Sequence, residues 1–331
     1  MLTRVLMPKN LFYRSDRDPG GAIRREMYMK ALRINDYGAA LHLDEVPVPT
    51  AGPGQVLVEN HFTSMNGVDP GRGLGFLRQV FPLQFPWTPG GDVAGRVAAI
   101  GEGVTTFKVG DEVFGYTREA GAYAEFVIVT ATSLAHRPAA ISAEEAAGIA
   151  LVGQTATRML ELSKIKAGQT LLIMGASGGV GSLAVQLARD AGVHVLATAR
   201  QSKAAALQEL GAERVIDLAQ QRLEEIQQVE AVLNLIGGDT VVPSYALVKP
   251  GGAAVTANRP PIAEEAARLG IEAAFVETNV TTEGLNAFAT LVADGKVKPQ
   301  IAAVETLWSP ATLWEKRELD GIGKVVFSVR A

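Results

Sequence analysis

A glycine-rich turn at residues 175–181 is the part of the sequence best suited to chemistry. An apolar run ending at Met174 leads into this turn, and apolar side chains then recur at helical spacing from Val180 to Ala188. Glycine at 178 lets the backbone approach a pyrophosphate, and glycine at 181 lets the helix lie close to the strand. The helix start adds unpaired N–H groups and a positive dipole end. We predict a dinucleotide site formed by Gly175, Ser177, Gly178, Gly179, Val180 and Gly181.

The turn differs from the usual GxGxxG pattern, because Ala176 stands at the first glycine position. The pattern is therefore AxGxxG, or GxxGxxG when counted from Gly175. Further strand–helix units follow in register, which favours a cofactor site over the alternative of a structural turn in an unliganded domain. No Lys-Ser/Thr pair follows Gly181, so the nucleoside triphosphate loop is excluded.

The end of the next strand indicates which dinucleotide would bind. An NAD site needs an acidic residue there for the ribose 2′-hydroxyl, and this segment has none. It offers instead the hydroxyls and cations of Thr198, Arg200, Ser202 and Lys203, which suit a 2′-phosphate. The alternative is that the two cations only begin a solvated helix. We predict NADPH as the cofactor.

Composition excludes several other kinds of chemistry. The chain has 331 residues, no cysteine and four histidines, so thiolate nucleophiles, iron–sulfur clusters and sulfur-based zinc sites are excluded, and we expect no metal. A net charge of -4 without a basic patch argues against nucleic acid. No apolar stretch approaches the ~18–20 residues that span a bilayer, and the N-terminus lacks an apolar signal region. We expect a cytoplasmic protein that contacts no membrane.

Three regions can be distinguished along the chain. Residues 1–28 show no sustained period and are predicted to be a disordered extension or a misassigned start, with a targeting peptide as the alternative. From residue 29 to 152, short strands alternate with Gly/Pro turns, which is typical of a small barrel or sandwich. Residues 153–280 alternate apolar strands with helices, as in a doubly wound α/β domain. A helix over Gly284–Ala293 and a final strand over Lys324–Val329 are predicted for residues 281–331.

Together these features resemble the zinc-independent medium-chain dehydrogenase/reductases of the quinone oxidoreductase (zeta-crystallin-like) family. The resemblance covers essentially all of residues 29–331. It rests on Met29-Lys-Ala31, Ser64-Met-Asn66-Gly-Val-Asp69, Pro89-Gly-Gly-Asp92-Val-Ala-Gly95-Arg-Val97, Ile100-Gly-Glu-Gly-Val104, Lys108-Val-Gly110-Asp111, Tyr123-Ala-Glu125, Gly153-Gln-Thr155-Ala156, the glycine turn, Gly237-Gly238, Leu247-Val-Lys-Pro-Gly-Gly252 and Gly323-Lys324-Val-Val326.

The resemblance implies an α/β chain with two domains. A GroES-like β-barrel catalytic domain would comprise residues 29–152 and 281–331, a Rossmann NADP-binding domain would comprise residues 153–280, and the chain would commonly form a homodimer. Zinc-dependent relatives carry Gly-His-Glu near the ligand site and four structural cysteines. Here the matching stretch is Gly90-Gly91-Asp92, and cysteine is absent.

The resemblance also implies site residues. Asn66 matches a residue at the nicotinamide end, and Asp69 on the same motif would orient it; a simple turn is the alternative for both. Thr155, Asn234, Gly237 and Lys324 are expected near the cofactor, with a surface position as the alternative for Lys324. The proton would come from solvent or from Tyr116 or Tyr123, although either tyrosine could equally be packed structure.

The expected function is hydride transfer from NADPH to a quinone or an α,β-unsaturated carbonyl, without a metal. The apolar stretch Val68–Thr88 would cover a small hydrophobic acceptor, or its aromatic residues would close one end of the barrel. Two alternatives remain. An enoyl-thioester reductase would need a basic patch, for which the stretch offers Arg72 and Arg78. A non-catalytic NADPH-binding regulatory or structural protein would lack an acceptor cleft.

Overall fold

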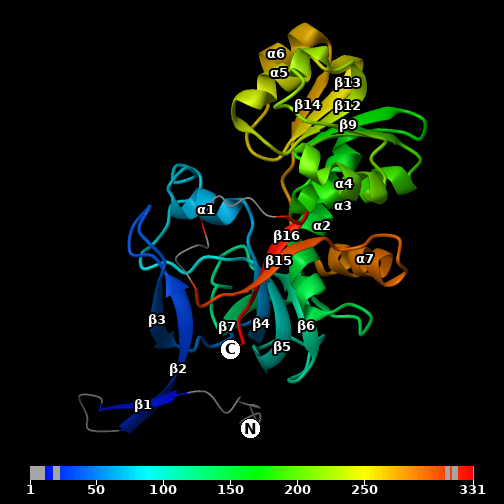
Figure 1. Cartoon of the computed structure of the whole chain (residues 1–331). Coiled ribbons are helices and arrows are strands. Elements are labelled where there is room, and N and C mark those ends of the chain that lie inside the picture. The colour runs from blue at the N-terminus through cyan, green and yellow to red at the C-terminus, as the bar shows by residue number, and fades with distance from the viewer. Residues whose placement is uncertain (1–11, 18–22, 310–313, 315–319, 331) are drawn as a thin grey trace.

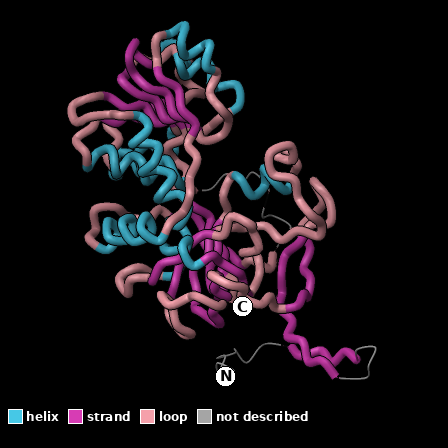
Figure 2. Tube along the Cα trace, turned by 180° about the vertical axis from the view of Figure 1, so that it is seen from behind, coloured by secondary structure: helices cyan, strands magenta, loops and turns pink. Residues whose placement is uncertain are grey.

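The computed structural model describes residues 12–17, 23–309, 314 and 320–330. Part of the segment predicted to be disordered forms a hairpin, because β1 (Phe12–Arg17) pairs antiparallel with β2 (Ile23–Arg33). Strand β2 continues into the body of the protein and pairs with β3 (His42–Pro47). Residues 12–17 and 23–28 thus form strands where a disordered extension was predicted, while residues 1–11 and 18–22 lie outside the described residues. In Figure 2 the hairpin projects away from the rest of the chain.

A six-stranded parallel sheet forms the upper part of the molecule in Figure 1. Its strands are β9 (Thr170–Met174), β10 (His194–Thr198), β11 (Arg214–Ile216), β12 (Val229–Asn234), β13 (Val248–Thr256) and β14 (Glu272–Phe275). They lie in the order β11-β10-β9-β12-β13-β14, so the strand order reverses between β9 and β12. Open parallel sheets bind ligands at the carboxyl ends of the strands at such a reversal.

Helices cover both faces of this sheet. They are α3 (Gly179–Asp190), α4 (Ala204–Leu210), α5 (Val241–Tyr245) and α6 (Ala263–Leu269). Leu171 and Ile173 of β9 belong to one core cluster with α3, while Leu172 and Met174 belong to another with Tyr245 of α5. Alternate residues of one strand thus serve two apolar cores, which explains the continuous apolar run in the sequence. The predicted doubly wound domain is confirmed.

The lower part of the molecule is a mostly antiparallel sheet around a second core. Its strands are β4 (Gln55–Ser64), β5 (Asp92–Ile100), β6 (Glu112–Tyr116), β7 (Phe126–Thr130), β8 (Leu134–His136), β15 (Ile301–Thr306) and β16 (Lys324–Ser328). Strand β16 pairs with β4, so a segment from the C-terminal part of the chain joins the N-terminal sheet. The predicted GroES-like barrel and the return of the C-terminal segment to it agree with this arrangement.

The described residues form three further α-helices: α1 (Val68–Gly73), α2 (Ala143–Ser163) and α7 (Thr282–Ala293). Helix α2 begins with a capping box, in which the Ser142 side chain accepts from the Glu145 N–H and the Glu145 side chain accepts from the Ser142 N–H. Its small residues, such as Ala146 and Ala150, are buried and allow close packing. Helix α2 contacts β4, β5 and β6 of the lower sheet and β12 and β13 of the upper one, so it joins the two parts.

Candidate functional site

The glycine turn at residues 175–181 has the geometry expected of a dinucleotide-binding site, and we call these residues the dinucleotide seat. A Cβ atom at Gly181 would lie 2.5 Å from the Gly175 carbonyl oxygen and 2.6 Å from the Ala176 Cα, so helix α3 lies directly against the end of β9. A Cβ atom at Gly178 would meet nothing closer than the Gly175 oxygen at 3.6 Å. Helix α3 has no side-chain cap at Gly178, so its first N–H groups remain available for an anion. These residues fit the pyrophosphate of a dinucleotide.

Strand β16 brings the lower sheet into contact with this turn. Gly323 and Gly178 form a parallel bridge, and the Gly323 N–H donates to the Ser177 carbonyl at 2.8 Å. The Lys324 side chain then crosses the first residue of α3, since a Cβ atom at Gly179 would lie 2.5 Å from the Lys324 Cδ. The dinucleotide seat and the lower domain therefore meet without an intervening loop.

The Lys324 ammonium is buried in a polar cluster, and only 5% of the residue is exposed. It donates to the Met65 carbonyl and the Asn66 Oδ1, both at 2.5 Å, and lies 3.4 Å from the Asp92 Oδ2. The alternative of a surface position for Lys324 is therefore wrong, while its approach to the cofactor phosphates stays a prediction. Only the aliphatic stem of Lys324 lies at the helix start, because the buried carboxylate and carbonyl attract the charge inward.

Asn66 has both side-chain atoms engaged in the same cluster. Its Nδ2 donates to the Asp92 Oδ2 at 2.7 Å, and its Oδ1 accepts from Lys324. Each of the two atoms thus makes one hydrogen bond within the cluster, which leaves a second N–H of the amide available. The prediction that Asn66 lies at the nicotinamide end stays a prediction, and within the protein Asn66 links Asp92 to Lys324.

Asp92 is the site residue that our sequence reasoning missed. It is fully buried. Its Oδ2 accepts a hydrogen bond from the Ser64 hydroxyl at 2.5 Å, and its Oδ1 accepts one from the Leu151 N–H at 3.0 Å. Asp92 begins the apolar strand β5, and a buried carboxylate requires compensating donors. The signal for Asp92 in the sequence is an acidic residue at the start of an apolar run.

Asp69 is a second buried carboxylate beside this cluster, with 3% of the residue exposed. Its Oδ2 accepts the Asn66 N–H at 2.8 Å, so it orients the Asn66 loop through the backbone. Burial raises the pKa of Asp69 to about 7, while the Asn66 hydrogen bond and the Lys324 charge oppose the rise. Asp69 is therefore able to hold or release a proton near neutral pH.

We expect the stability of the protein to fall as the pH rises from 4 to 8 because of Asp69. The folded state binds the Asp69 proton up to a pKa of about 7, whereas the unfolded chain releases it near the ordinary value of 3.8. Between these values the folded state binds more protons, so the free energy of unfolding decreases by on the order of 3 kcal/mol. Urea unfolding across this range should show the decrease, and Asp69→Asn should remove it. Asp294→Asn, at an exposed helix end, is the control. An unchanged pH dependence in Asp69→Asn would contradict the assignment.

The two candidate tyrosines have different surroundings. The Tyr116 ring fills the space beside Gly91, and a Cβ atom at Gly91 would collide with it. Its hydroxyl has no hydrogen-bond partner among the described residues. Burial and the charges of Asp69 and Asp92 raise the Tyr116 pKa, while the Arg72 and Arg118 cations oppose the rise.

Tyr123, in contrast, belongs to the core. It is 0% exposed, and its ring lies 5.9 Å from that of Phe327 in the cluster that also holds Leu32 and Val325. The buried hydroxyl has no hydrogen-bond partner among the described residues. An electron acceptor could not reach this fully buried hydroxyl. The structure therefore corrects the prediction of Tyr123 as a proton donor and favours the alternative, in which its ring packs in the core.

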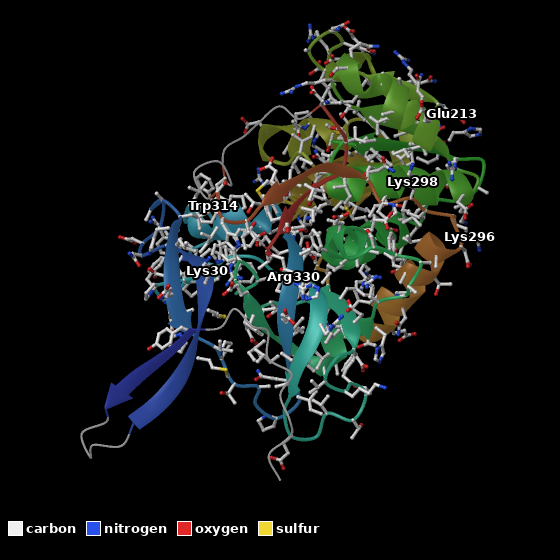
Figure 3. All side chains as sticks on the ribbon, turned by 60° about the horizontal axis from the view of Figure 1, so that its bottom comes forward. Lys30, Glu213, Lys296, Lys298, Trp314 and Arg330 are labelled. Atoms are coloured by element: carbon white, nitrogen blue, oxygen red, sulfur yellow. The ribbon has the colours of Figure 1, made fainter. Side chains whose placement is uncertain are left out.

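The aromatic stretch over residues 68–88 is divided between core and surface. Trp87 is buried, and the Arg72 guanidinium lies 5.2 Å from its ring and 5.7 Å from that of Phe81. Phe76 is 81% exposed. Figure 3 places Trp314 beside α1, where its ring packs on Gly73. The aromatic residues therefore do not share one role, because Trp87 is buried, as expected for closure of the barrel, while Phe76 lies on the surface.

The predicted 2′-phosphate residues do not all face outward. The Thr198 hydroxyl accepts the Gly175 N–H at 3.1 Å, and the Lys203 ammonium donates to the Asp320 carbonyl at 2.7 Å. Both residues are buried, and their polar atoms form hydrogen bonds within the protein. The structure therefore does not present Thr198 and Lys203 as phosphate ligands. Arg200 and Ser202 are exposed at the carboxyl end of β10. Both side chains are accessible from solvent at this strand end.

The remaining predicted residues lie near the strand ends. Thr155 donates to the Leu151 carbonyl and lies 2.9 Å from the Thr278 hydroxyl, between the two domains. The Asn234 side chain accepts the Ile236 and Gly237 N–H groups, so it shapes the loop after β12 and is not free for a cofactor. Gly237 has φ +75° and packs on Asn258. The prediction for Asn234 is corrected to a loop-forming role.

The described residues do not offer a zinc site. Within residues 12–17, 23–309, 314 and 320–330, no three histidine, aspartate or glutamate side chains gather as metal ligands. At the position where zinc-dependent relatives carry histidine, Gly91 is packed against the Tyr116 ring. The donor set therefore does not fit zinc.

None of the helices among these residues is long and apolar enough to cross a membrane.

Two family models match the chain. The model described as an alcohol dehydrogenase GroES-like domain matches residues 52–139, and the one described as a zinc-binding dehydrogenase matches residues 179–292. The second description names a metal for which the described residues hold no ligand set. The two matches correspond to the lower and upper parts of the molecule.

Three similar proteins indicate the range of relatives. A chloroplastic quinone oxidoreductase of Triphysaria versicolor is 38% identical over 57% of this chain and 61% of its own length, so the match spans less than two thirds of that relative. An NADPH-dependent alkenal/one oxidoreductase of Arabidopsis thaliana is 32% identical over 82% of this chain and 72% of its own length. The quinone oxidoreductase structure from Coxiella burnetii has a TM-score of 0.82 and 28% identity, covering 92% of this chain and 100% of that one.

Proposed function

Because the chain belongs to the quinone oxidoreductase-like family of the medium-chain dehydrogenase/reductases, we propose that it reduces a quinone or an α,β-unsaturated carbonyl with NADPH. The observation that carries this proposal is the contact between the glycine turn and the buried Lys324–Asn66–Asp92 cluster, because it sets a dinucleotide seat beside the proton-holding Asp69. The names of the quinone and alkenal/one oxidoreductase relatives support the same acceptor classes.

The residues of this chain would orient the reactants and supply a proton. When bound, a reduced nicotinamide supplies a hydride to an electron-poor carbon of the acceptor. The N–H groups at the start of α3 would hold the pyrophosphate, and the Tyr116 hydroxyl would protonate the reduced acceptor. Trp87 and Phe81, which flank the Arg72 guanidinium, supply apolar surface that would help to exclude water.

We infer a preference for NADPH over NADH from Arg200, which lies at the end of β10 beside the exposed Ser202. Replacing Arg200 by Asp would put a negative charge near the 2′-phosphate and should raise the NADPH dissociation constant at least tenfold more than that of NADH. Isothermal titration with both dinucleotides measures the ratio. Arg214→Asp, on the neighbouring strand β11, is the control. An unchanged ratio in Arg200→Asp would remove Arg200 from the site.

A panel of acceptors tests the function itself. NADPH oxidation should be observed with quinones or with enones and enals. The proposed reductase function is contradicted if none of these acceptors is reduced. An enoyl-thioester reductase is the second candidate, since Arg72 and Arg78 lie on the stretch beside the site. It would be favoured only if a coenzyme A thioester were reduced faster than the free enone. Dinucleotide binding without any turnover would favour a regulatory or structural protein.

We also propose a cytoplasmic homodimer. The strand β14 lies at the edge of the upper sheet, and Phe275 at its end is 40% exposed. An exposed strand edge with an apolar side chain suits pairing with a second copy. Light scattering of the purified chain would give the mass, and a monomer at micromolar concentration would contradict the proposal.

A further inference from the structure

Arg72 on α1 carries a guanidinium without a carboxylate partner in the described part of the chain. Its Nη1 donates to the Arg118 carbonyl at 3.3 Å, and its buried Nε has no hydrogen-bond partner among the described residues. The guanidinium carbon lies 5.2 Å from the centre of the Trp87 ring and 5.7 Å from that of Phe81. Asp69, one turn earlier on α1, bonds to the loop backbone instead. Because charges removed from water are usually paired, Arg72 offers a positive charge and unused donors to a ligand.

The residues that follow Arg72 expose apolar surface. The turn after α1 is compact, since the Leu77 N–H donates to the Gly71 carbonyl at 3.1 Å and the Phe81 N–H donates to the Leu77 carbonyl at 2.7 Å. Exposed large apolar side chains are normally scattered singly. This turn carries several of them at 38–81% exposure: Leu74, Phe76, Val80 and Phe81. A cation beside such side chains fits a ligand with one anionic end and an apolar body.

Arg118 places Arg72 at the junction of the two domains. The Arg118 carbonyl accepts from Arg72, while the Arg118 guanidinium donates to the Glu277 Oε1 at 3.0 Å. Arg118 belongs to the loop after β6 in the lower part of the molecule, and Glu277 follows the carboxyl end of β14 in the upper part. Open parallel sheets bind ligands at that edge. The loop begins directly after Tyr116, so Arg72 is hydrogen-bonded two residues beyond the proposed proton donor.

We propose that Arg72 is a specificity-determining residue that binds a carboxylate of the acceptor, which makes the acceptor an α,β-unsaturated keto acid with an apolar body. This inference rests on the proposed function for the reaction. A guanidinium binds a carboxylate through two parallel N–H···O bonds, and residues 74–81 cover the apolar body. In the reduction, the alkene carbon β to the ketone accepts the hydride of NADPH, which becomes NADP⁺, and the carbon α to the ketone accepts a proton. The carboxylate is unchanged and serves as the anchor.

Recognition is measured without turnover by using a product analogue. Benzoylpropionate has the carboxylate, the ketone and an apolar ring but no alkene, and its methyl ester lacks the charge. Both are titrated calorimetrically into the chain with NADP⁺ present. We expect the acid to bind about 10- to 100-fold more tightly than the ester. Arg72→Met, whose stem still packs on the Trp87 and Phe81 rings, should abolish this preference and leave the affinity for the ester unchanged.

Arg96→Met is the control, because Arg96 is a guanidinium of the same domain that already pairs with Glu112 at 2.7 Å. It should keep the preference for the acid. Equal affinity of the original chain for acid and ester, or binding of neither, would overturn the proposal before any variant is made. A preference for the acid that persists in Arg72→Met would assign the carboxylate to another cation.

Turnover separates this inference from the proposed function. With benzoylacrylate, the unsaturated keto acid, Arg72→Met should raise KM about 10- to 100-fold, while kcat with the methyl ester of benzoylacrylate stays unchanged. A chain that binds benzoylpropionate through Arg72 but reduces neither benzoylacrylate nor its ester contradicts the proposed function and supports the Arg72 site. A chain that reduces both compounds with the same KM contradicts this inference and leaves the proposed function standing.

Discussion

Replacing Gly181 by Ala should abolish measurable dinucleotide binding and lower the stability of the protein. The added methyl group would lie 2.5 Å from the Gly175 carbonyl oxygen and 2.6 Å from the Ala176 Cα. Both contacts are with backbone, which cannot rotate away, so helix α3 must move off the end of β9. Overpacking of this kind costs about 1–3 kcal/mol. Because the helix start carries the N–H groups for the pyrophosphate, the same movement should weaken NADPH binding by more than 100-fold.

The stability control for this prediction is Gly178→Ala, because its methyl group would meet only the Gly175 carbonyl oxygen at 3.6 Å and should leave the free energy of unfolding unchanged. Thermal unfolding and NADPH fluorescence titration give the two quantities separately. If Gly181→Ala bound NADPH as tightly as the original chain, the turn would not be the seat of the dinucleotide, whatever happened to stability.

Replacing Tyr116 by Phe should lower kcat for an enone by about 100-fold while leaving the affinity for NADPH unchanged. Burial and the charges of Asp69 and Asp92 raise the Tyr116 pKa, so the phenol keeps its proton at neutral pH until a strong base such as the enolate of a reduced enone takes it. General acid catalysis by one positioned group contributes about 10²–10⁴-fold. The loss should be smaller for a quinone, because the oxygens of the reduced quinone exchange protons with water readily.

Tyr123→Phe is the matched control for this prediction. It removes a hydroxyl that is fully buried and has no hydrogen-bond partner among the described residues. Losing an unsatisfied buried hydroxyl should leave activity unchanged and should not reduce stability. Steady-state kinetics with one enone and one quinone compare the two variants. Equal activity in Tyr116→Phe and Tyr123→Phe would assign the proton to water.

The sequence was sufficient to predict the fold, because local patterns specify its main units. The apolar strands and the helical spacing after the turn predicted the doubly wound sheet, and the apolar run that ends at Met174 coincides with β9. Strand β15 was not predicted, and the positions of the short strands before residue 152, such as β3, were not specified. Both lie at the edges of their sheets, where little burial imposes a pattern.

The site was predicted less completely, because side-chain direction depends on distant parts of the chain. Thr198, Lys203 and Asn234 are at the predicted strand ends, but their polar atoms bond to Gly175, Asp320 and Gly237 respectively. Spacing along the sequence identifies which residues are near a site. It does not tell whether a hydroxyl or an ammonium is used by the fold or presented to a ligand.

The separation of Lys324 from Asn66, which is 258 positions along the chain, also has a kinetic consequence. Closing such a long loop is entropically unfavourable, so contacts of this kind generally form late in folding. The Lys324–Asn66 contact lies where β16 meets the end of β4, so it forms only after the C-terminal strand has joined the N-terminal part of the seven-stranded sheet. During refolding from urea, dinucleotide binding should therefore return after the helical circular dichroism signal, with the slowest observable phase.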